Sequence, residues 1–145
     1  MDKIITAPTF DISQYTADAS NNIKTYELFA SGMCLQRDAI NRIWGKASST
    51  NNIAAEINGN VYYGRVKSRE WEIYLPKMQA GGPYELTIIS ELGRLTLTDI
   101  YIGEVFLLSG QSNMEWQPQH SGEVLKDMYA TSDCENGQIR ILQMG

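Results

Sequence analysis

An apolar run that ends abruptly in a polar turn constrains this chain more than any other feature. Residues 105–108 read Val-Phe-Leu-Leu, and residues 109–113 read Ser-Gly-Gln-Ser-Asn. A short, unbroken apolar run is typical of a strand that is buried on both faces of a parallel sheet. Gly110 can adopt backbone conformations that other residues avoid, so a sharp turn is expected there. The pattern therefore predicts that Ser112 lies at the carboxyl edge of a sheet, where open α/β folds bind ligands.

Ser112 has two interpretations. With Glu115 it forms a Ser-x-x-Glu capping box, which would satisfy free amide groups at the start of a helix. A serine on a strand-to-helix turn is also placed like a nucleophile, although the Gly-x-Ser-x-Gly pattern of the α/β-hydrolases is absent. Caps greatly outnumber catalytic serines, so the local pattern alone favours the cap. Both roles are compatible, because amides gathered at a helix start can also stabilise an oxyanion.

Short strand patterns dominate the chain before residue 98. Asn58-Gly59 is a strong signal for a two-residue hairpin turn. Trp71, Ile73 and Leu75 alternate with polar residues, as in a half-buried strand. Turns are expected at 80–83 and 91–93. The expected strands are 52–57, 61–66, 70–75, 84–89 and 94–97. Regularly spaced short strands, with no convincing helix before Gly110, predict a β-sandwich.

The pattern changes at Thr98-Asp99-Ile100. The expected strand at 105–108 is followed by helical spacing of apolar residues over 122–130 and by a further strand at 139–142. A strand, a helix and a strand form one βαβ unit, which opens a doubly wound α/β domain. The sequence therefore predicts a mostly β chain, with a β-sandwich domain over residues 1–99 and the start of an α/β domain over 100–145.

Three large aromatic residues have two possible roles. Trp44, Trp71 and Tyr84 are expected to pack in the core or between the sheets, because large aromatic side chains are most often buried. The alternative is an exposed aromatic patch that binds sugar rings.

Charge and residue usage argue against several functions. The net charge of -5 and the scattered basic residues argue against a nucleic-acid or anionic-membrane partner. No segment is long and apolar enough to span a membrane, and residues 1–8 lack the apolar core of a signal peptide.

Cys34 and Cys134 lie far apart, so a disulfide between them is not expected and Cys34 is expected to be a buried thiol. With one histidine, His120, and dispersed carboxylates, no metal site or cofactor is predicted.

The segment Gly-Gln-Ser-Asn-Met at 110–114, after Gly-Glu-Val-Phe-Leu-Leu-Ser at 103–109, closely resembles the first sequence block of the sialate O-acetylesterase family. That family belongs to the SGNH (GDSL-like) hydrolases. Further segments resemble other blocks of the family in the same order, so the resemblance runs from about residue 28 to residue 142. These segments are 28–29, 32–38, 43–47, 71–76, 80–88 and 138–142.

The resemblance implies that the α/β part is the beginning of a flavodoxin-like SGNH hydrolase domain. It implies a serine esterase that removes O-acetyl groups from sialic acid or related sugars through an acyl-enzyme. Ser112 would be the nucleophile, and its backbone amide would be one oxyanion donor. The residues that would support the turn or line the cleft are Gly110, Gln111, Asn113, Glu115 and Trp116.

The family's base is a histidine in an Asp-x-x-His motif, which this sequence lacks. His120 is expected to be a solvated loop histidine. The chain alone is therefore expected to be inactive, and its apolar segment at 105–108 to promote self-association or to pack on the sandwich. The alternative function is a non-catalytic carbohydrate-binding or scaffolding β-sandwich. The resemblance also suggests an extracellular, periplasmic or lysosomal location.

Overall fold

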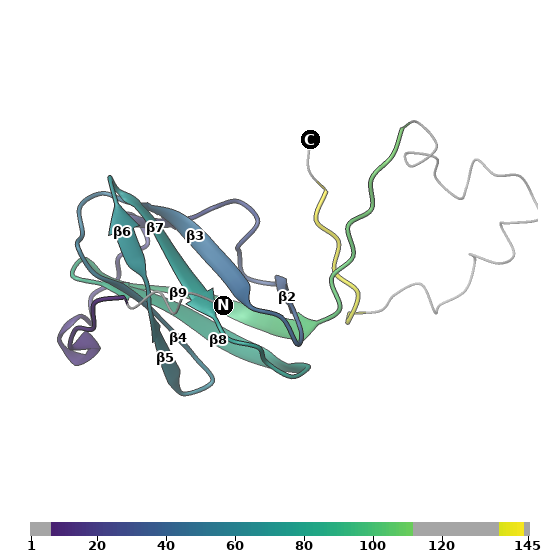
Figure 1. Ribbon diagram of the computed structural model, residues 1–145, viewed down its shortest axis with the longest axis horizontal. Coiled ribbons are helices and arrows are strands. Elements are labelled where there is room, and N and C mark those ends of the chain that lie inside the picture. The colour runs from purple at the N-terminus through teal and green to yellow at the C-terminus, as the bar shows by residue number, and fades with distance from the viewer. Residues whose placement is uncertain (1–6, 112–136, 144–145) are drawn as a thin grey trace, which may run out of the picture. The chain divides into compact units, whose positions relative to one another are not determined.

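The computed structural model describes residues 7–111 and 137–143, and the protein is mostly β in these ranges (Figure 1). The chain divides into two compact units, Met1–Glu104 and Val105–Gly145. Within the described residues, the regular structure outside the strands is a single 3-10 turn, η1 (Ile12–Gln14), which Asp11 caps by accepting a hydrogen bond from the Ser13 amide. The expectation of a mostly β chain is confirmed.

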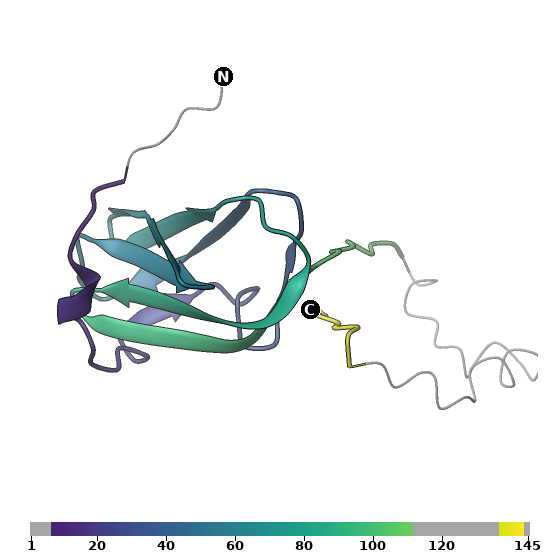
Figure 2. The same cartoon turned by 90° about the horizontal axis from the view of Figure 1, so that it is seen from below.

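Nine strands in the described part of the first unit form two sheets. The first sheet has the order β1-β3-β7-β6, and the second has the order β2-β9-β8-β4-β5. Strand β2 pairs with β9 in parallel, whereas the other pairs are antiparallel. Figure 2 shows the long strands β8 and β9 running side by side along the unit. The strands are β1 (Ile23–Thr25), β2 (Cys34–Gln36), β3 (Asn41–Ala47), β4 (Ile53–Ile57), β5 (Asn60–Tyr63), β6 (Arg65–Lys67), β7 (Glu70–Leu75), β8 (Gly81–Ser90) and β9 (Gly93–Gly103).

The core draws on both sheets. Trp71 is 2% exposed, and Ile73 and Leu75 are fully buried, which confirms the alternation expected along β7. They share one apolar cluster with side chains of β4, β8 and β9. Burying each such side chain contributes about 1.5–3 kcal/mol. Trp44 and Tyr84 are half-buried and pack against this cluster. The packing expected for the three aromatic residues is therefore confirmed, but of the three only Trp71 is fully buried.

The hairpin expected at Asn58-Gly59 is confirmed. Both residues have positive φ, 50° and 73°, and Ile57 pairs directly with Asn60. The strand expected over 61–66 is, however, divided at Gly64, after which the chain leaves β5 and enters β6 in the other sheet. A side chain at Gly64 would lie 2.3 Å from the Glu72 carbonyl oxygen, so only glycine fits this crossing between the sheets.

Strands β8 and β9 are longer than expected. The residues expected to form a turn at 80–83 include the start of β8, which begins at Gly81. The pairing of β8 with β9 shifts register on either side of Tyr84, and Asp99 in β9 has a φ of 60°. These irregularities are β-bulges, which bend a strand without ending it. The boundary expected between residues 99 and 100 therefore falls inside β9, and the compact unit extends to Glu104.

The strands expected at 105–108 and 139–142 are not found. Both segments are irregular and exposed, with 93% of Leu107 and 89% of Ile141 accessible to solvent. An apolar run becomes a buried strand only where neighbouring strands and covering helices bury it. The described residues of the second unit contain no such elements. The helix expected at 122–130 lies outside the described residues, so the βαβ unit is not confirmed.

Candidate functional site

The predicted nucleophile, Ser112, and most of its predicted supporting residues lie outside the described part of the chain. Gly110 and Gln111 are described, and both are exposed at the end of the first range. The others, Ser112, Asn113, Glu115 and Trp116, lie outside the described residues, as does His120, which is expected to be a solvated loop histidine. The assignment of Ser112 as nucleophile and of its neighbours as supporting residues therefore stays a prediction.

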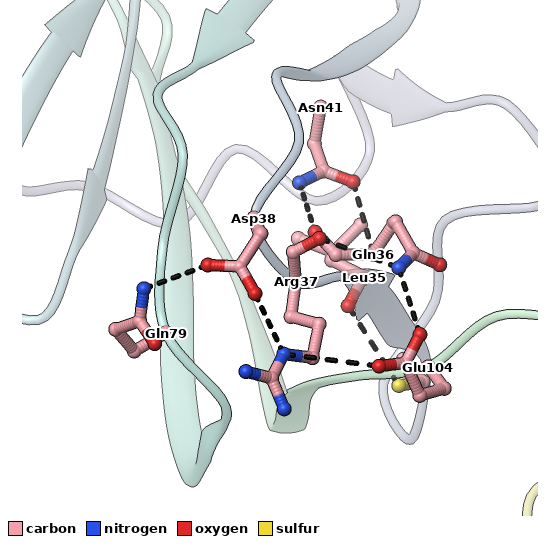
Figure 3. Close-up of polar contacts among 8 residues, drawn as sticks. Leu35, Gln36, Arg37, Asp38, Asn41, Gln79 and Glu104 are labelled. Atoms are coloured by element: carbon pink, nitrogen blue, oxygen red, sulfur yellow. Dashed lines mark hydrogen bonds and ion pairs between the residues drawn. The ribbon is translucent and has the colours of Figure 1, made fainter.

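A polar network surrounds the end of β9, directly before the segment that contains Ser112 (Figure 3). Gln36 is paired with Gly103, and the Arg37 amide donates to the Gly103 carbonyl at 2.8 Å. The Glu104 carboxylate accepts a hydrogen bond of 3.1 Å from Nε2 of Gln36. Its other oxygen lies 3.8 Å from Nε of Arg37. Gln36, the last residue of β2, and Arg37, which follows it, thus contact Glu104, the first residue after β9.

Asp38 holds the other side of the Arg37 guanidinium. The Arg37 Nε donates to Oδ2 of Asp38 at 2.8 Å, and Nε2 of Gln79 donates to Oδ1 of Asp38 at 2.7 Å. The hydrogen bond from Arg37 lowers the pKa of Asp38, and the same bond raises the pKa of Arg37. Both groups therefore stay ionised at neutral pH.

The backbone around the network is also fixed. Asn41 donates from Nδ2 to the Gln36 carbonyl at 2.8 Å and accepts from the Gln36 amide at 3.1 Å. Asp38 has a φ of 54°, and its amide donates to the Met78 carbonyl at 2.9 Å. Side chains that are paired in this way suit anchoring rather than proton transfer.

Sequence reasoning did not assign a role to Gln36, Arg37 or Glu104. They belong to the segments 32–38 and 103–109, which both resemble family blocks. Gln36 and Glu104 are 68 positions apart in the sequence, and only the parallel pairing of β2 with β9 brings them together. The only sequence signal for these three residues was that the segments 32–38 and 103–109 each contain charged side chains beside an apolar strand.

The aromatic residues favour packing over sugar binding. Tyr26 stacks on Trp44 with ring centroids 5.5 Å apart, and Phe29 contacts the same ring edge-on at 4.6 Å. The Arg42 guanidinium lies 5.1 Å from the centroid of the Trp44 ring. Three neighbours therefore occupy the surroundings of Trp44, whereas a sugar platform needs an open ring face.

A shallow depression lies between the β3–β4 loop and the β6–β7 turn, with a volume of about 290 Å³. Its lining is polar apart from Val66, unlike the mostly apolar walls of typical ligand pockets. It is lined by Ser48, Ser49, Thr50, Asn51, Val66, Ser68 and Arg69.

Within residues 7–111 and 137–143, no group of three histidine, cysteine, aspartate or glutamate side chains could hold a metal ion. Cys34 is half-buried rather than buried, beside Gly103, and Cys134 lies outside those ranges. None of the described helical structure is long and apolar enough to cross a membrane.

Comparisons with known proteins identify relatives of one kind. No family model matches the chain. The sialate O-acetylesterase of Mus musculus is 32% identical over 76 residues, which cover 50% of this chain and 14% of the relative. The sialate O-acetylesterase of Homo sapiens is 32% identical over 88 residues, which cover 55% of this chain and 16% of the relative.

A solved structure gives the same indication. The crystal structure of a carbohydrate acetylesterase from Xanthomonas citri matches with a TM-score of 0.61 and 36% sequence identity. The match covers 65% of this chain and 22% of that chain. The resemblance to sialate O-acetylesterases is thus confirmed, although the chain spans only 14–16% of the length of these curated relatives.

Proposed function

We propose that this chain is the N-terminal part of a serine esterase that removes O-acetyl groups from sialic acid or related sugars. The similarity to the Xanthomonas citri carbohydrate acetylesterase supports this most strongly, because that protein has 36% sequence identity and a similar fold over 65% of this chain. In this proposal, the two-sheet unit is a β-sandwich that precedes an SGNH hydrolase domain. That domain begins within residues 105–145.

Ser112 forms the acyl-enzyme. Its hydroxyl attacks the acetyl carbonyl carbon while a base accepts the hydroxyl proton, because a serine hydroxyl is a weak nucleophile on its own. The backbone amide of Ser112 donates to the developing oxyanion. The sugar oxygen leaves with the proton from the base, and water then cleaves the acetyl ester on Ser112 to release acetate.

The neighbours of Ser112 support this chemistry. In this proposal, the residues that support the turn or line the cleft beside Ser112 are Gly110, Gln111, Asn113, Glu115 and Trp116. The base, by family resemblance, is a histidine of an Asp-x-x-His motif beyond this sequence, so the 145-residue chain alone is inactive.

The test is the Ser112→Ala variant of the longer protein that contains this chain. Acetate release from O-acetylated sialic acid should fall by at least about 10³-fold, because the nucleophile is lost. Circular dichroism and the melting temperature should not change. Ser109→Ala, a serine in the same segment, is the matched control and should retain activity.

Two results would contradict the proposal. Ser112→Ala could still cleave acetyl esters at the wild-type rate, which would exclude an acyl-enzyme at Ser112. The wild-type protein could also bind O-acetylated sugars without hydrolysing them, which would favour the non-catalytic carbohydrate-binding module.

A further inference from the structure

We propose that the polar depression beside the β6–β7 turn, together with the basic residues that lead to it, binds a chain of carboxylate-bearing sugars. Arg69 binds one carboxylate in the depression, and Lys46 and Lys67 bind others along the outer face of the first sheet. The choice of an acidic sugar chain rests on the proposed function, because sialic acid carries a carboxylate. The binding itself requires no hydrolysis.

A row of charged side chains crosses the outer face of the first sheet, in which Figure 1 shows β3, β7 and β6 side by side. Residues directly opposite each other on neighbouring strands point to the same face. Strands lie about 4.8 Å apart, so a row across four strands extends about 14 Å, which is longer than one sugar ring. The row consists of Lys24, Lys46, Glu70 and Lys67, which pair in register on β1, β3, β7 and β6 and are all exposed.

The positive charge of this face is not balanced locally. Lys24 lies directly opposite Lys46, an unfavourable arrangement for like charges. In the part of the chain that the structure describes, neither Lys46 nor Lys67 forms an ion pair. Folding thus gathers basic residues on one face of a chain whose net charge is -5, and such a face attracts anions. The outer face carries the basic residues Lys24, Arg42, Lys46, Arg65 and Lys67 and the carboxylates Glu70 and Glu72.

The depression begins where this row ends. Its lining residue Ser68 directly follows Lys67, and Ser48 lies two positions after Lys46. Arg69 also lines it, and no ion pair with another described residue neutralises the Arg69 guanidinium. A guanidinium can bind a carboxylate through two parallel hydrogen bonds. The serine, threonine and asparagine side chains around it can bind the hydroxyl groups of a sugar.

Both walls of the depression are fixed by the fold. In the β3–β4 loop, the Thr50 hydroxyl and the Asn51 amide both donate to the Glu91 carboxylate, the latter at 3.3 Å. At the β6–β7 turn, the Arg69 carbonyl accepts a hydrogen bond of 2.9 Å from the Ala47 amide. A site whose backbone is already ordered loses less conformational freedom on binding.

The backbone of the β6–β7 turn is strained at Arg69. Ser68 and Arg69 have φ of 52° and 71°, a region that residues other than glycine and asparagine rarely adopt. Strained backbone is found most often at functional sites, where the surrounding structure holds it. Asn-Gly would suit this turn better, but it would remove the guanidinium from the depression. The turn therefore sacrifices stability and retains Arg69 at the site.

The experiment uses the longer protein that contains this chain and poly-α2,8-sialic acid without O-acetyl groups. Isothermal titration calorimetry gives the affinity. The double variant Ser68→Asn/Arg69→Gly should bind at least about 10-fold more weakly, because a charge-assisted hydrogen-bonded pair is lost. Its melting temperature should equal or exceed that of the wild type, so misfolding cannot account for the loss. Arg69→Gln should weaken binding to a similar extent.

The lysines and a matched control define the rest of the surface. Lys46→Gln and Lys67→Gln should each weaken binding about two- to fivefold, because exposed charges contribute less than a bidentate pair. Lys77→Gln removes an exposed charge from the β7–β8 loop, outside the proposed surface, and should bind as tightly as the wild type. Added NaCl should weaken wild-type binding. Neutral dextran should not bind.

Absence of binding by the wild type, or unchanged affinity in either Arg69 variant, would overturn the inference. Equally tight binding of duplex DNA or of phosphatidylserine vesicles would also overturn it, because a general attraction for polyanions would then suffice. The proposed function fails separately, if Ser112→Ala still releases acetate. Since the glycan in this experiment carries no acetyl ester, its binding is measured independently of that result.

Discussion

A single carboxylate, Glu91, joins the β8–β9 turn to the loop before β4. It accepts hydrogen bonds from Oγ1 of Thr50 and Nδ2 of Asn52, and from the amides of Asn51 and Asn52 at 3.3 and 3.2 Å. Partial burial raises the pKa of Glu91, but the hydrogen bonds from Thr50 and Asn52 outweigh it and lower the pKa below its ordinary value of 4.5. One side chain thereby satisfies donors that would otherwise need water.

The lowered pKa of Glu91 predicts loss of stability in acid. Because the folded state holds this proton less tightly than the unfolded state, protonation favours unfolding. The contribution is complete above pH 4.5 and is lost as the pH falls through the folded-state pKa. Glu91→Gln should lower the free energy of unfolding by about 1 kcal/mol at pH 7 and by less at pH 3.5. Urea unfolding at both pH values measures this.

The control for this experiment is Glu85→Gln, which removes an exposed carboxylate of β8. It should leave the free energy of unfolding within about 0.5 kcal/mol of the wild type at pH 7. A Glu91→Gln effect of the same size at both pH values would show that the charge of Glu91 is not what stabilises the turn.

Two hairpins of the first unit use tight turns of the same kind with different residues. Asn58 and Gly59 join β4 to β5 with φ of 50° and 73°, and Ser68 and Arg69 join β6 to β7 with φ of 52° and 71°. Positive φ at both central residues is the condition for a type I′ turn, which favours Asn-Gly. Ser68-Arg69 departs from this preference, so two side chains adopt an unfavourable conformation there.

Replacing Ser68-Arg69 by Asn-Gly should therefore stabilise the protein. Asparagine and glycine adopt positive φ readily, so the double variant should gain about 1 kcal/mol in the free energy of unfolding. The measurement is the midpoint of urea unfolding with an unchanged slope. The reciprocal exchange of Asn58-Gly59 for Ser-Arg is the matched control and should destabilise by a similar amount. No gain in the first variant would mean that Ser68 and Arg69 make compensating contacts.

At the scale of the whole molecule, the described residues of the two units differ in how far their apolar side chains are exposed to solvent. The first unit buries most of its large aliphatic residues in one core. The second exposes 79% of Phe106, 93% of Leu107 and 76% of Leu108. Contiguous exposed apolar residues mark a surface that another protein segment covers. In a longer protein, the rest of the proposed hydrolase domain would cover it.

The isolated 145-residue chain is therefore expected to self-associate through residues 105–108. Light scattering after size exclusion should show species larger than a monomer at micromolar concentration, because apolar extended segments pair with one another. Residues 1–104 alone should remain monomeric, since the core lies within that unit. Leu107→Lys should shift the 145-residue chain toward the monomer. A monomeric wild-type chain at high concentration would contradict this expectation.

One part of the candidate site can be recognised in a contiguous stretch of sequence, whereas another part depends on contacts between distant residues. Ser112 and its neighbours were found from one contiguous sequence block, and they remain a prediction because they lie outside the described residues. The Gln36–Glu104 contact could not be found from the sequence, because it depends on which strands become neighbours.

The sequence by itself determined the local structure of the first unit. Alternation placed Trp71, Ile73 and Leu75 in the core, and Asn58-Gly59 placed a hairpin, because both signals depend only on residues a few positions apart. Only the tertiary structure decided that Gly64 divides one apparent strand between two sheets and that β2 lies parallel to β9. It also left residues 105–108 exposed, because an apolar run is buried only where distant parts of a chain fold against it.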